Sequence, residues 1–285
     1  MELSIVTINY NNAEGLRKTL VSVAEQTYRD IEHIIIDGGS TDGSIEVIRD
    51  YVERLKIEDR ILKIDWVSEK DNGIYNAMNK GIRKASGEYI QILNSGDILA
   101  NPDVTQRMMD ALRLRIEDRR LKNGVEILYG NMIKKDYETG KIIGKSGEVE
   151  YSLRQYYSAT LNHDCCYIRR DMFETYGLYD EKLNIVSDWK WFLKAIGMGQ
   201  VRPVYVDVDV TIFDASGISE SNLGLRKKER RQVLEEVISP AILTDYDAHA
   251  FEIEQMNRLR KYHLYGLVYI IERVLFKLEK WRILR

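Results

Sequence analysis

The chain has 285 residues, of which 44% are hydrophobic and 31% are charged, and its formal net charge is −3. This is the composition of an ordinary globular protein, and it excludes a collagen-like, low-complexity or wholly disordered chain. Because Lys and Arg are not in excess, the chain as a whole is not a basic scaffold for nucleic-acid phosphates, and we expect no nucleic-acid partner.

The first hundred residues alternate between strand and helix patterns. Strands are predicted over residues 3–8, 34–36, 64–67 and 89–93. Helices with apolar residues at helical spacing are predicted between them, over residues 16–24, 45–55 and 74–82. This alternation predicts an α/β fold built from right-handed βαβ units, with helices on both faces of a parallel sheet.

The pattern is looser beyond Asn101. A helix is predicted over residues 103–119 and another over 188–196, and strands over residues 125–135, 141–145, 165–168 and 204–210, with a turn at Glu138-Thr139-Gly140 between the first two strands. No internal repeat or linker is visible. We therefore predict one α/β domain over residues 1–218 and a helical extension over residues 219–285.

The extension is amphipathic and basic. Residues 258–285 contain eight Lys or Arg residues against two Glu. The following side chains share one helical stripe: Leu264, Leu267, Val268, Ile271, Val274, Leu275, Leu278 and Trp281. Such a helix either lies on an anionic membrane surface or packs on the domain or a second copy of the chain, because the stripe alone does not distinguish the two.

The sequence also indicates a compartment. Cys165 and Cys166 are the only cysteines, and adjacent side chains do not easily adopt disulfide geometry, so a disulfide framework is excluded and a reducing compartment fits. No secretory pattern opens the chain, and no apolar run reaches the roughly 18 residues that span a membrane. We expect a cytoplasmic protein, either free or at the inner face of the membrane.

Polar side chains follow each of the first four predicted strands. Asn9, Asp37, Asp71 and Asp97 stand at or just after the strand ends. Because ligands of parallel sheets bind at the carboxyl ends of the strands, we expect these side chains to share one crevice. An acidic crevice repels a diphosphate unless a divalent cation bridges the two, or unless the acids contact the base and ribose instead.

An aspartate at a strand or helix end also has a simpler, structural explanation. Asp42 is expected to cap the helix that follows it, whereas Asp37 directly ends an Ile-Ile-Ile strand, where packing alone disfavours a carboxylate.

The motifs of three enzyme classes are missing. The chain has no Gly-x-Gly-x-x-Gly after its first strand, no Gly-x-x-x-x-Gly-Lys-Ser/Thr and no Gly-x-Ser-x-Gly. Dinucleotide oxidoreductases, P-loop NTPases and α/β-hydrolases therefore lose their main support.

Four ordered segments carry a family resemblance. They are SIVTINYNN at residues 4–12, IIIDGGSTDG at 34–43, SEKDNGIYNAMNKG at 68–81 and YIQILNSGD at 89–97. Together they resemble inverting family-2 glycosyltransferases of the GT-A fold, and a weaker match extends to about Asp214. The resemblance implies a Rossmann-like, mostly parallel sheet flanked by helices.

The resemblance also implies the residues that hold the nucleotide and a metal. It places the nucleotide at Thr7, Asn9, Tyr10, Asp37, Asp71, Asn94, Ser95 and Gly96, and a divalent metal, Mg²⁺ or Mn²⁺, at Asp97. Asn94 and Gly96 stand where the family commonly has carboxylates, so Asp97 is the one acidic ligand expected in this segment. A single aspartate suffices chemically, because Mg²⁺ keeps waters and takes phosphate oxygens. The metal is expected to stabilise the departing diphosphate.

The catalytic base of the family matches Asp188, in Ser187-Asp188-Trp189 at the start of a helix. Inversion requires a carboxylate that takes the proton of the acceptor hydroxyl on the face opposite the leaving group. A helix N-terminal acid is the simpler explanation of Asp188, and we favour catalysis. His163 and Trp189 are assigned to the acceptor or diphosphate side, and a structural role remains equally open for His163.

These inferences predict an inverting enzyme. It is expected to move a sugar from a nucleotide-diphosphate sugar to a hydroxyl of a glycan or lipid-linked acceptor in cell-surface polysaccharide synthesis. UDP is the nucleotide by family habit, with dTDP and GDP still open. The alternative is a non-catalytic nucleotide-sugar-binding or assembly partner with a degraded metal motif.

Overall fold

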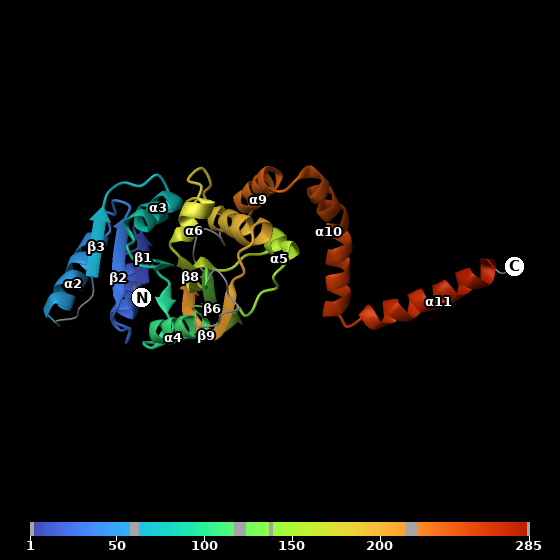
Figure 1. The fold of residues 1–285 in the computed structure, drawn as a ribbon, viewed down its shortest axis with the longest axis horizontal. Helices are drawn as coiled ribbons and strands as arrows, with labels where there is room; N and C mark the ends of the chain where they lie inside the picture. Colours follow the sequence, from blue (N-terminus) through green and yellow to red (C-terminus); the bar gives the residue numbers. More distant parts are fainter. Residues whose placement is uncertain (1–2, 58–62, 117–123, 137–138, 215–221, 284–285) are drawn as a thin grey trace. The chain divides into compact units, whose positions relative to one another are not determined.

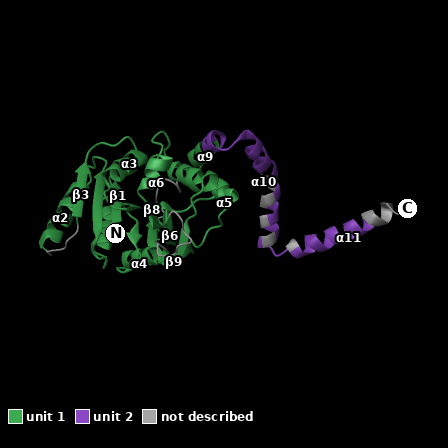
Figure 2. Ribbon diagram, viewed as in Figure 1, with its two compact units in different colours: residues 1–231 green, residues 232–285 purple. Residues whose placement is uncertain are grey.

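The fold is described from a computed structural model, which covers residues 3–57, 63–116, 124–136, 139–214 and 222–283 (Figure 1). The chain divides into two compact units, residues 1–231 and residues 232–285 (Figure 2). The predicted boundary between residues 218 and 219 lies outside the described residues, as do Glu138 of the predicted turn and residues 117–119 of the predicted helix.

The first half of unit 1 follows the predicted alternation. Its elements are β1 (Leu3–Asn9), α1 (Ala13–Ala24), β2 (Ile31–Asp37), α2 (Ser44–Ile57), β3 (Lys63–Ser68), α3 (Ile74–Lys84) and β4 (Tyr89–Asn94). The four strands are parallel and lie in the order β3-β2-β1-β4. The register sets Asn9 opposite Asp37, and Asp37 opposite Ser68. The polar residues that end these strands therefore lie side by side.

The second half extends the same sheet with mixed strand directions. Its elements are β5 (Ile98–Leu99), α4 (Val104–Ile116), β6 (Ile127–Lys135), β7 (Ile142–Lys145), α5 (Leu153–Ser158), η1 (His163–Cys165), β8 (Cys166–Arg169), α6 (Asp171–Tyr176), α7 (Ser187–Phe192), η2 (Leu193–Met198) and β9 (Val204–Asp214). β8 runs antiparallel to both β4 and β6, whereas β9 is parallel to β6. The parallel pairing predicted from the first hundred residues therefore holds for β1 to β4, and the sheet as a whole is mixed. The short β5, α5 and α6 were not predicted.

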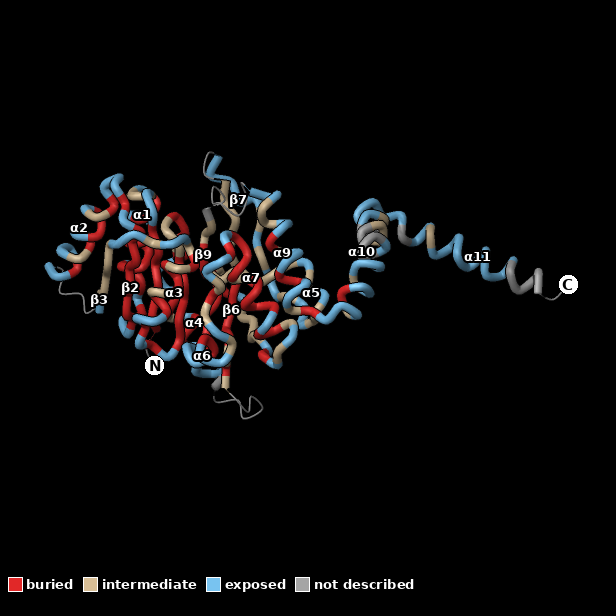
Figure 3. Tube along the Cα trace, turned by 90° about the horizontal axis from the view of Figure 1, so that it is seen from above, coloured by how far each residue is buried: buried red, intermediate tan, exposed pale blue. Residues whose placement is uncertain are grey.

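Two clusters of buried apolar side chains hold helices against the sheet. One buried cluster joins α1 and α2 to β2 through Leu16, Leu20, Ile35 and Ile48. The other joins β1 and β4 to α4, β6 and β9, and it includes the buried Cys165. Figure 3 shows that buried residues run along β2, β6 and α7. Burial of this apolar area is the main favourable term in folding.

Unit 2 is helical, as the sequence predicts. It contains the end of α9 (Leu223–Val237), then α10 (Pro240–Lys261) and α11 (Tyr265–Ile283). Large apolar side chains of α11 are exposed, among them Leu267, Ile271, Leu275 and Leu278. Within the described part of the chain, no helix combines the length and apolar character needed to cross a membrane.

Candidate active site

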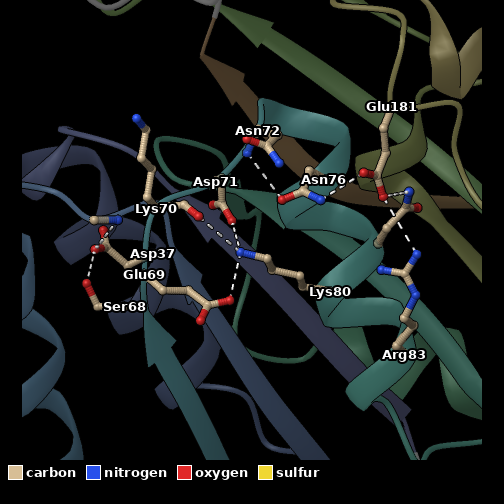
Figure 4. Close-up of polar contacts among 12 residues, drawn as sticks. Asp37, Ser68, Glu69, Lys70, Asp71, Asn72, Asn76, Lys80, Arg83 and Glu181 are labelled. Atoms are coloured by element: carbon tan, nitrogen blue, oxygen red, sulfur yellow. Dashed lines mark hydrogen bonds and ion pairs between the residues drawn. The ribbon is translucent and has the colours of Figure 1, made fainter.

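Side-chain hydrogen bonds connect the carboxyl ends of three parallel strands. Asn9, the last residue of β1, donates from Nδ2 to Oδ1 of Asp37 at 2.8 Å and to Oγ of Ser40 at 3.2 Å. Ser68, at the end of β3, donates to Oδ2 of Asp37 at 2.6 Å (Figure 4). The polar groups predicted at these strand ends therefore meet at one edge of the sheet.

Asp37 is completely buried and remains ionised. Burial raises the pKa of its carboxyl, but hydrogen bonds from Ser40, Ser68 and Asn9 outweigh burial, and the net pKa is lowered. The backbone amides of Gly39 and Ser40 also donate to Oδ2, at 3.2 and 2.9 Å. Asp37 thus orders the loop after β2. Oδ1 of Asn9 is buried with no hydrogen-bond partner among the described residues, so an acceptor is left there for a ligand.

The backbone at Gly38 passes between two predicted nucleotide residues. A Cβ at this position would lie 3.1 Å from Oδ2 of Asp71 and 3.1 Å from the ring carbon Cδ2 of Tyr10. The Tyr10 side chain is 68% exposed, so its ring face is open to stacking. Lys80 of α3 contacts Oδ1 of Asp71 and lies 2.8 Å from Glu69 (Figure 4). This lysine fixes the loop that carries Asp71.

A tight turn follows β4 and contains the predicted metal residue. The amide of Asp97 donates to the carbonyl of Asn94 at 3.0 Å and closes the turn. Thr19 of α1 fixes this turn, because its hydroxyl accepts a hydrogen bond from the amide of Gly96 and donates one to the carbonyl of Asp97. The Ser95 amide donates to the backbone of β1. These contacts fix Asn94, Ser95, Gly96 and Asp97 at the same end of the sheet as Asn9.

Asp188 lies at the start of α7 and both of its oxygens accept hydrogen bonds. Tyr75 of α3 donates to Oδ1 at 2.9 Å, and Nδ1 of His163 lies 3.0 Å from Oδ2. Burial raises the pKa of Asp188, but the hydrogen bond and charge of His163 and the hydroxyl of Tyr75 outweigh it, so the pKa is lowered. Asp188 is therefore an ionised carboxylate in a desolvated setting at neutral pH.

His163 is charged for the same reason. Burial lowers its pKa, but the contact with Asp188, together with the charges of Asp164 and Asp97, raises it to about 9. A charged imidazole has hydrogen on both nitrogens and therefore needs an acceptor at Nε2. Nε2 lies 3.2 Å from the amide nitrogen of Asn94, whose Oδ1 is buried without a partner in the described part of the chain. Rotating this amide by 180° presents Oδ1 to Nε2 and satisfies both groups.

A cavity of about 200 Å³ brings together the second half of the predicted site. Asp97, His163, Asp188 and Trp189 all line it. The Trp189 ring is buried, and its Nε1 donates to the carbonyl of Tyr156 at 2.7 Å. The residues predicted as base, metal ligand and acceptor-side contacts therefore line one cavity.

Other predicted residues lie outside this cavity. Asn9, Asp37 and Asp71 do not line it; they belong to the cluster around Gly38. The Thr7 side chain is not brought to either group, because it is fully buried within the sheet and its hydroxyl lies 3.0 Å from Nε2 of His33. The contact with His33 gives the Thr7 hydroxyl a partner inside the sheet.

Two residues that support Asp188 were not predicted from the sequence. Tyr75 is in the third resembling segment, but nothing local shows that its hydroxyl reaches Asp188. Glu229, buried in α9, accepts from the amides of Asn184 and Ile185 at 2.8 and 2.9 Å and so holds the loop before α7. No sequence signal marks Glu229, because its partners are 44 and 45 residues away.

The donor set allows a metal that is completed by substrate. The described residues contain no group of three or more His, Cys, Asp and Glu side chains able to hold a metal ion. Asp97 offers one hard oxygen ligand in the cavity wall. Mg²⁺ is commonly held by one or two carboxylates, with phosphate oxygens and water in the other positions. Asp97 fits that mode of binding.

Sequence comparison places the chain in a family. The model of glycosyl transferase family 2 matches residues 4–177. An uncharacterized glycosyltransferase of Mycobacterium tuberculosis is 30% identical over 222 residues, which cover 76% of each chain. A PGL/p-HBAD biosynthesis glycosyltransferase of Mycobacterium bovis is 26% identical over 214 residues, covering 75% of this chain and 77% of the relative.

Solved structures show the same architecture. S. aureus TarS 1–349 in complex with UDP-GlcNAc aligns with a TM-score of 0.61 at 18% identity, over 83% of this chain and 65% of that chain. The mannosyltransferase PcManGT from Pyrobaculum calidifontis, in complex with GDP-Man and Mn²⁺, aligns with a TM-score of 0.55 at 20% identity, over 81% and 60%. The chain thus spans about two thirds or less of these two structures. The fold is that of GT-A glycosyltransferases. The chain belongs to glycosyl transferase family 2.

Proposed function

We propose that the protein is an inverting glycosyltransferase that moves a sugar from a nucleotide-diphosphate sugar to a hydroxyl of a glycan or lipid-linked acceptor in cell-surface polysaccharide synthesis. One observation carries the proposal: Asp188 is an ionised, desolvated carboxylate in the wall of a cavity that it shares with Asp97. Displacement at an anomeric carbon needs such a base on one side and stabilisation of the leaving diphosphate on the other.

Asp188 is proposed to take the proton of the acceptor hydroxyl as that oxygen attacks the anomeric carbon. The bond from that carbon to the diphosphate oxygen breaks on the opposite face, and the configuration inverts. Tyr75 and His163 hold the carboxylate by its two oxygens, which fixes its direction before the acceptor enters. Both contacts also lower the pKa of Asp188, which favours a carboxylate base that is ionised at neutral pH.

The nucleotide is proposed to bind at the cluster around Gly38. Tyr10 offers an exposed ring for stacking, and Asn9 and Asp71 offer oxygens for the base and ribose. Asp37 supports Asn9, because its own oxygens are already occupied. UDP is favoured by the UDP-GlcNAc complex of TarS, and the GDP-Man complex of PcManGT keeps GDP as the second candidate. The name of the PGL/p-HBAD relative supports a lipid-linked acceptor.

Asp97 is proposed to hold Mg²⁺ or Mn²⁺ together with the sugar donor. When bound, the metal would neutralise charge that grows on the departing diphosphate. The turn from Asn94 to Asp97 is fixed to α1 and β1, so its one carboxylate is held ready for that contact.

Transfer and hydrolysis should be measured for a panel of UDP-, dTDP- and GDP-sugars, with and without Mn²⁺. Asp188→Asn should lower kcat by about 10²- to 10⁴-fold, the usual contribution of a positioned base. Asp171→Asn, an exposed acid paired with Arg169, is the matched control and should keep wild-type turnover. Full activity of the Asp188 variant, or no turnover of any sugar donor by the wild type, would refute the proposal.

The second candidate is a non-catalytic nucleotide-sugar-binding or assembly partner. It is favoured by the same segment, in which Asp97 is the one acid among Asn94, Ser95, Gly96 and Asp97. In that case UDP should bind with equal affinity with and without Mn²⁺, and no sugar donor should be turned over. Metal-strengthened UDP binding with turnover would exclude it.

A further inference from the structure

Helix α9 adds two cations to the wall of the cavity that holds Asp188. Arg226 and Arg230 line it, and Lys134 of β6 lines it as well. Both arginines lie beyond residues 4–177, the part of the chain that the family model matches. Their presence in the cavity therefore does not follow from the motifs that assign the chain to its family.

Arg230 is held in place and has one donor left over. Its guanidinium carbon lies 4.7 Å from the centre of the Trp189 ring, and Nη1 donates to the carbonyl of Ser158 at 2.7 Å. Nε is buried and has no hydrogen-bond partner among the described residues. Thr160 also lines the cavity, and its buried hydroxyl likewise has no hydrogen-bond partner among the described residues. Buried polar groups in folded proteins rarely remain without a partner.

Asp97, Asp164 and Asp188 also line the cavity, so an anion is favoured at the two arginines of α9 rather than along the whole wall. Burial and the neighbouring charge of Arg226 lower the pKa of Arg230, and the charge of Asp188 opposes that shift. The hydrogen bonds to the Asp188 carboxylate come from Tyr75 and His163, and Asp188 acts on Arg230 through its charge. The planar fork of a guanidinium matches the oxygen atoms of a phosphate, and two such forks bind it better than one.

We propose that Arg226 and Arg230 bind a phosphate group of a ligand in this cavity, with the Thr160 hydroxyl as a further donor. The inference rests on the proposed function, in which the cavity receives the reacting ends of the sugar donor and the acceptor. Two sources supply this chemistry: the diphosphate of the sugar donor, or a phosphate ester carried by the acceptor near its nucleophilic hydroxyl. Arg230 stacks on Trp189, which follows the base in the chain, so an acceptor phosphate bound there would place its hydroxyl near Asp188.

The test is titration calorimetry on the full chain with two probes, UDP and glycerol 3-phosphate. The variant Arg226→Gln/Arg230→Gln should weaken binding of at least one probe by about tenfold or more, because charge-assisted hydrogen bonds are lost. Lys227→Gln/Lys228→Gln removes the same charge from exposed positions of the same helix and should change either affinity less than about twofold. A loss confined to UDP identifies the diphosphate of the sugar donor, and a loss confined to glycerol 3-phosphate identifies an acceptor phosphate.

Several results would overturn the proposal. They are wild-type binding of neither probe, unchanged binding of both probes by the arginine variant, or an equal loss in the lysine control. The single variant Arg226→Gln separates loss of binding from misfolding, because it keeps the stacking of Arg230 on Trp189. It should weaken binding of the same probe, by less than the double variant does. Asp188→Asn should lower kcat by about 10²- to 10⁴-fold while it keeps phosphate binding, so failure of the proposed base and failure of the phosphate site give different results.

Discussion

Nδ1 of His163 lies 3.0 Å from Oδ2 of Asp188, and the same imidazole faces Asn94 through Nε2. The contact joins the turn that follows β4 to the start of α7, although 69 residues separate Asn94 from His163. The charge on His163 therefore affects its contacts with both Asp188 and Asn94. This pair decides how the site responds to pH.

Stability should depend on pH through this pair. The pKa of His163 is raised from 6.5 to about 9, so its stabilising effect is complete below pH 6.5 and is lost as pH rises through about 9. The pKa of Asp188 is lowered, so its contribution is present above pH 3.8 and is lost at more acidic pH. The Tm difference between wild type and His163→Gln should be largest between pH 4 and 6.5 and close to zero above about pH 9.

Activity provides the second readout of the same pair. kcat/KM of the wild type should be flat around neutral pH and fall above about pH 9, because a neutral His163 no longer supports Asp188. His163→Gln should lack this alkaline limb. His33 does not interfere, since burial lowers its pKa to about 3 and keeps it neutral. An alkaline limb that survives in the variant would assign the titration to another group.

Removing the Tyr75 hydroxyl should impair catalysis more than folding. Tyr75→Phe deletes the hydrogen bond to Oδ1 of Asp188, and a bond to a charged group contributes about 1.5–3 kcal/mol, so kcat should fall roughly tenfold to a hundredfold. Tyr179→Phe is the matched control. Its ring lies 5.7 Å from that of Tyr75, and its buried hydroxyl has no partner among the residues described. Equal kinetic losses in both variants would argue against a role for Tyr75 at the base.

The two halves of the fold differed in how far the sequence predicted them. Strands β1 to β4 and their helices follow from hydrophobic period, because each parallel strand is buried on both faces and each helix covers the sheet with one stripe. The same reasoning does not predict where β8 pairs in the sheet. Its four residues, Cys166–Arg169, resemble any short buried strand, and nothing local shows that it enters the sheet antiparallel beside β4.

The site shows the same limit. Asn9 and Asp37 were predicted to meet because they end neighbouring parallel strands, and the register pairs them. Tyr75 and Asp188 are 113 residues apart and meet only because α3 packs near α7 in the finished fold. Thr7 was predicted to hold the nucleotide with Asn9 and lies on the same face of β1, but its hydroxyl lies against the buried Nε2 of His33, a contact that the motif does not show. Contacts set by local geometry were predictable, whereas those set by tertiary packing were not.

Nucleotide affinity should be sensitive to a single methyl group at Gly38. Gly38→Ala places a Cβ 3.1 Å from both Asp71 and Tyr10, so one of these side chains must move. We expect UDP to bind about tenfold more weakly, with little change in Tm, because the affected Tyr10 is exposed. Gly144→Ala is the control, since its Cβ would meet only Lys134 at an ordinary 3.8 Å. Unchanged UDP affinity in Gly38→Ala would remove this cluster from the nucleotide site.

The exposed apolar side chains of α11 should bind an anionic membrane surface. The helix presents Ile271 and Leu275 at 49% and 54% exposure within a segment rich in Lys and Arg, a combination that lies in the headgroup region of anionic bilayers. The full chain should sediment with phosphatidylglycerol vesicles and much less with phosphatidylcholine vesicles. Ile271→Asp/Leu275→Asp should abolish this. Ile142→Asp/Ile143→Asp removes similarly exposed residues from β7 and should not. If the α11 variant still sediments but its oligomer mass changes, the helix contacts a second copy of the chain instead.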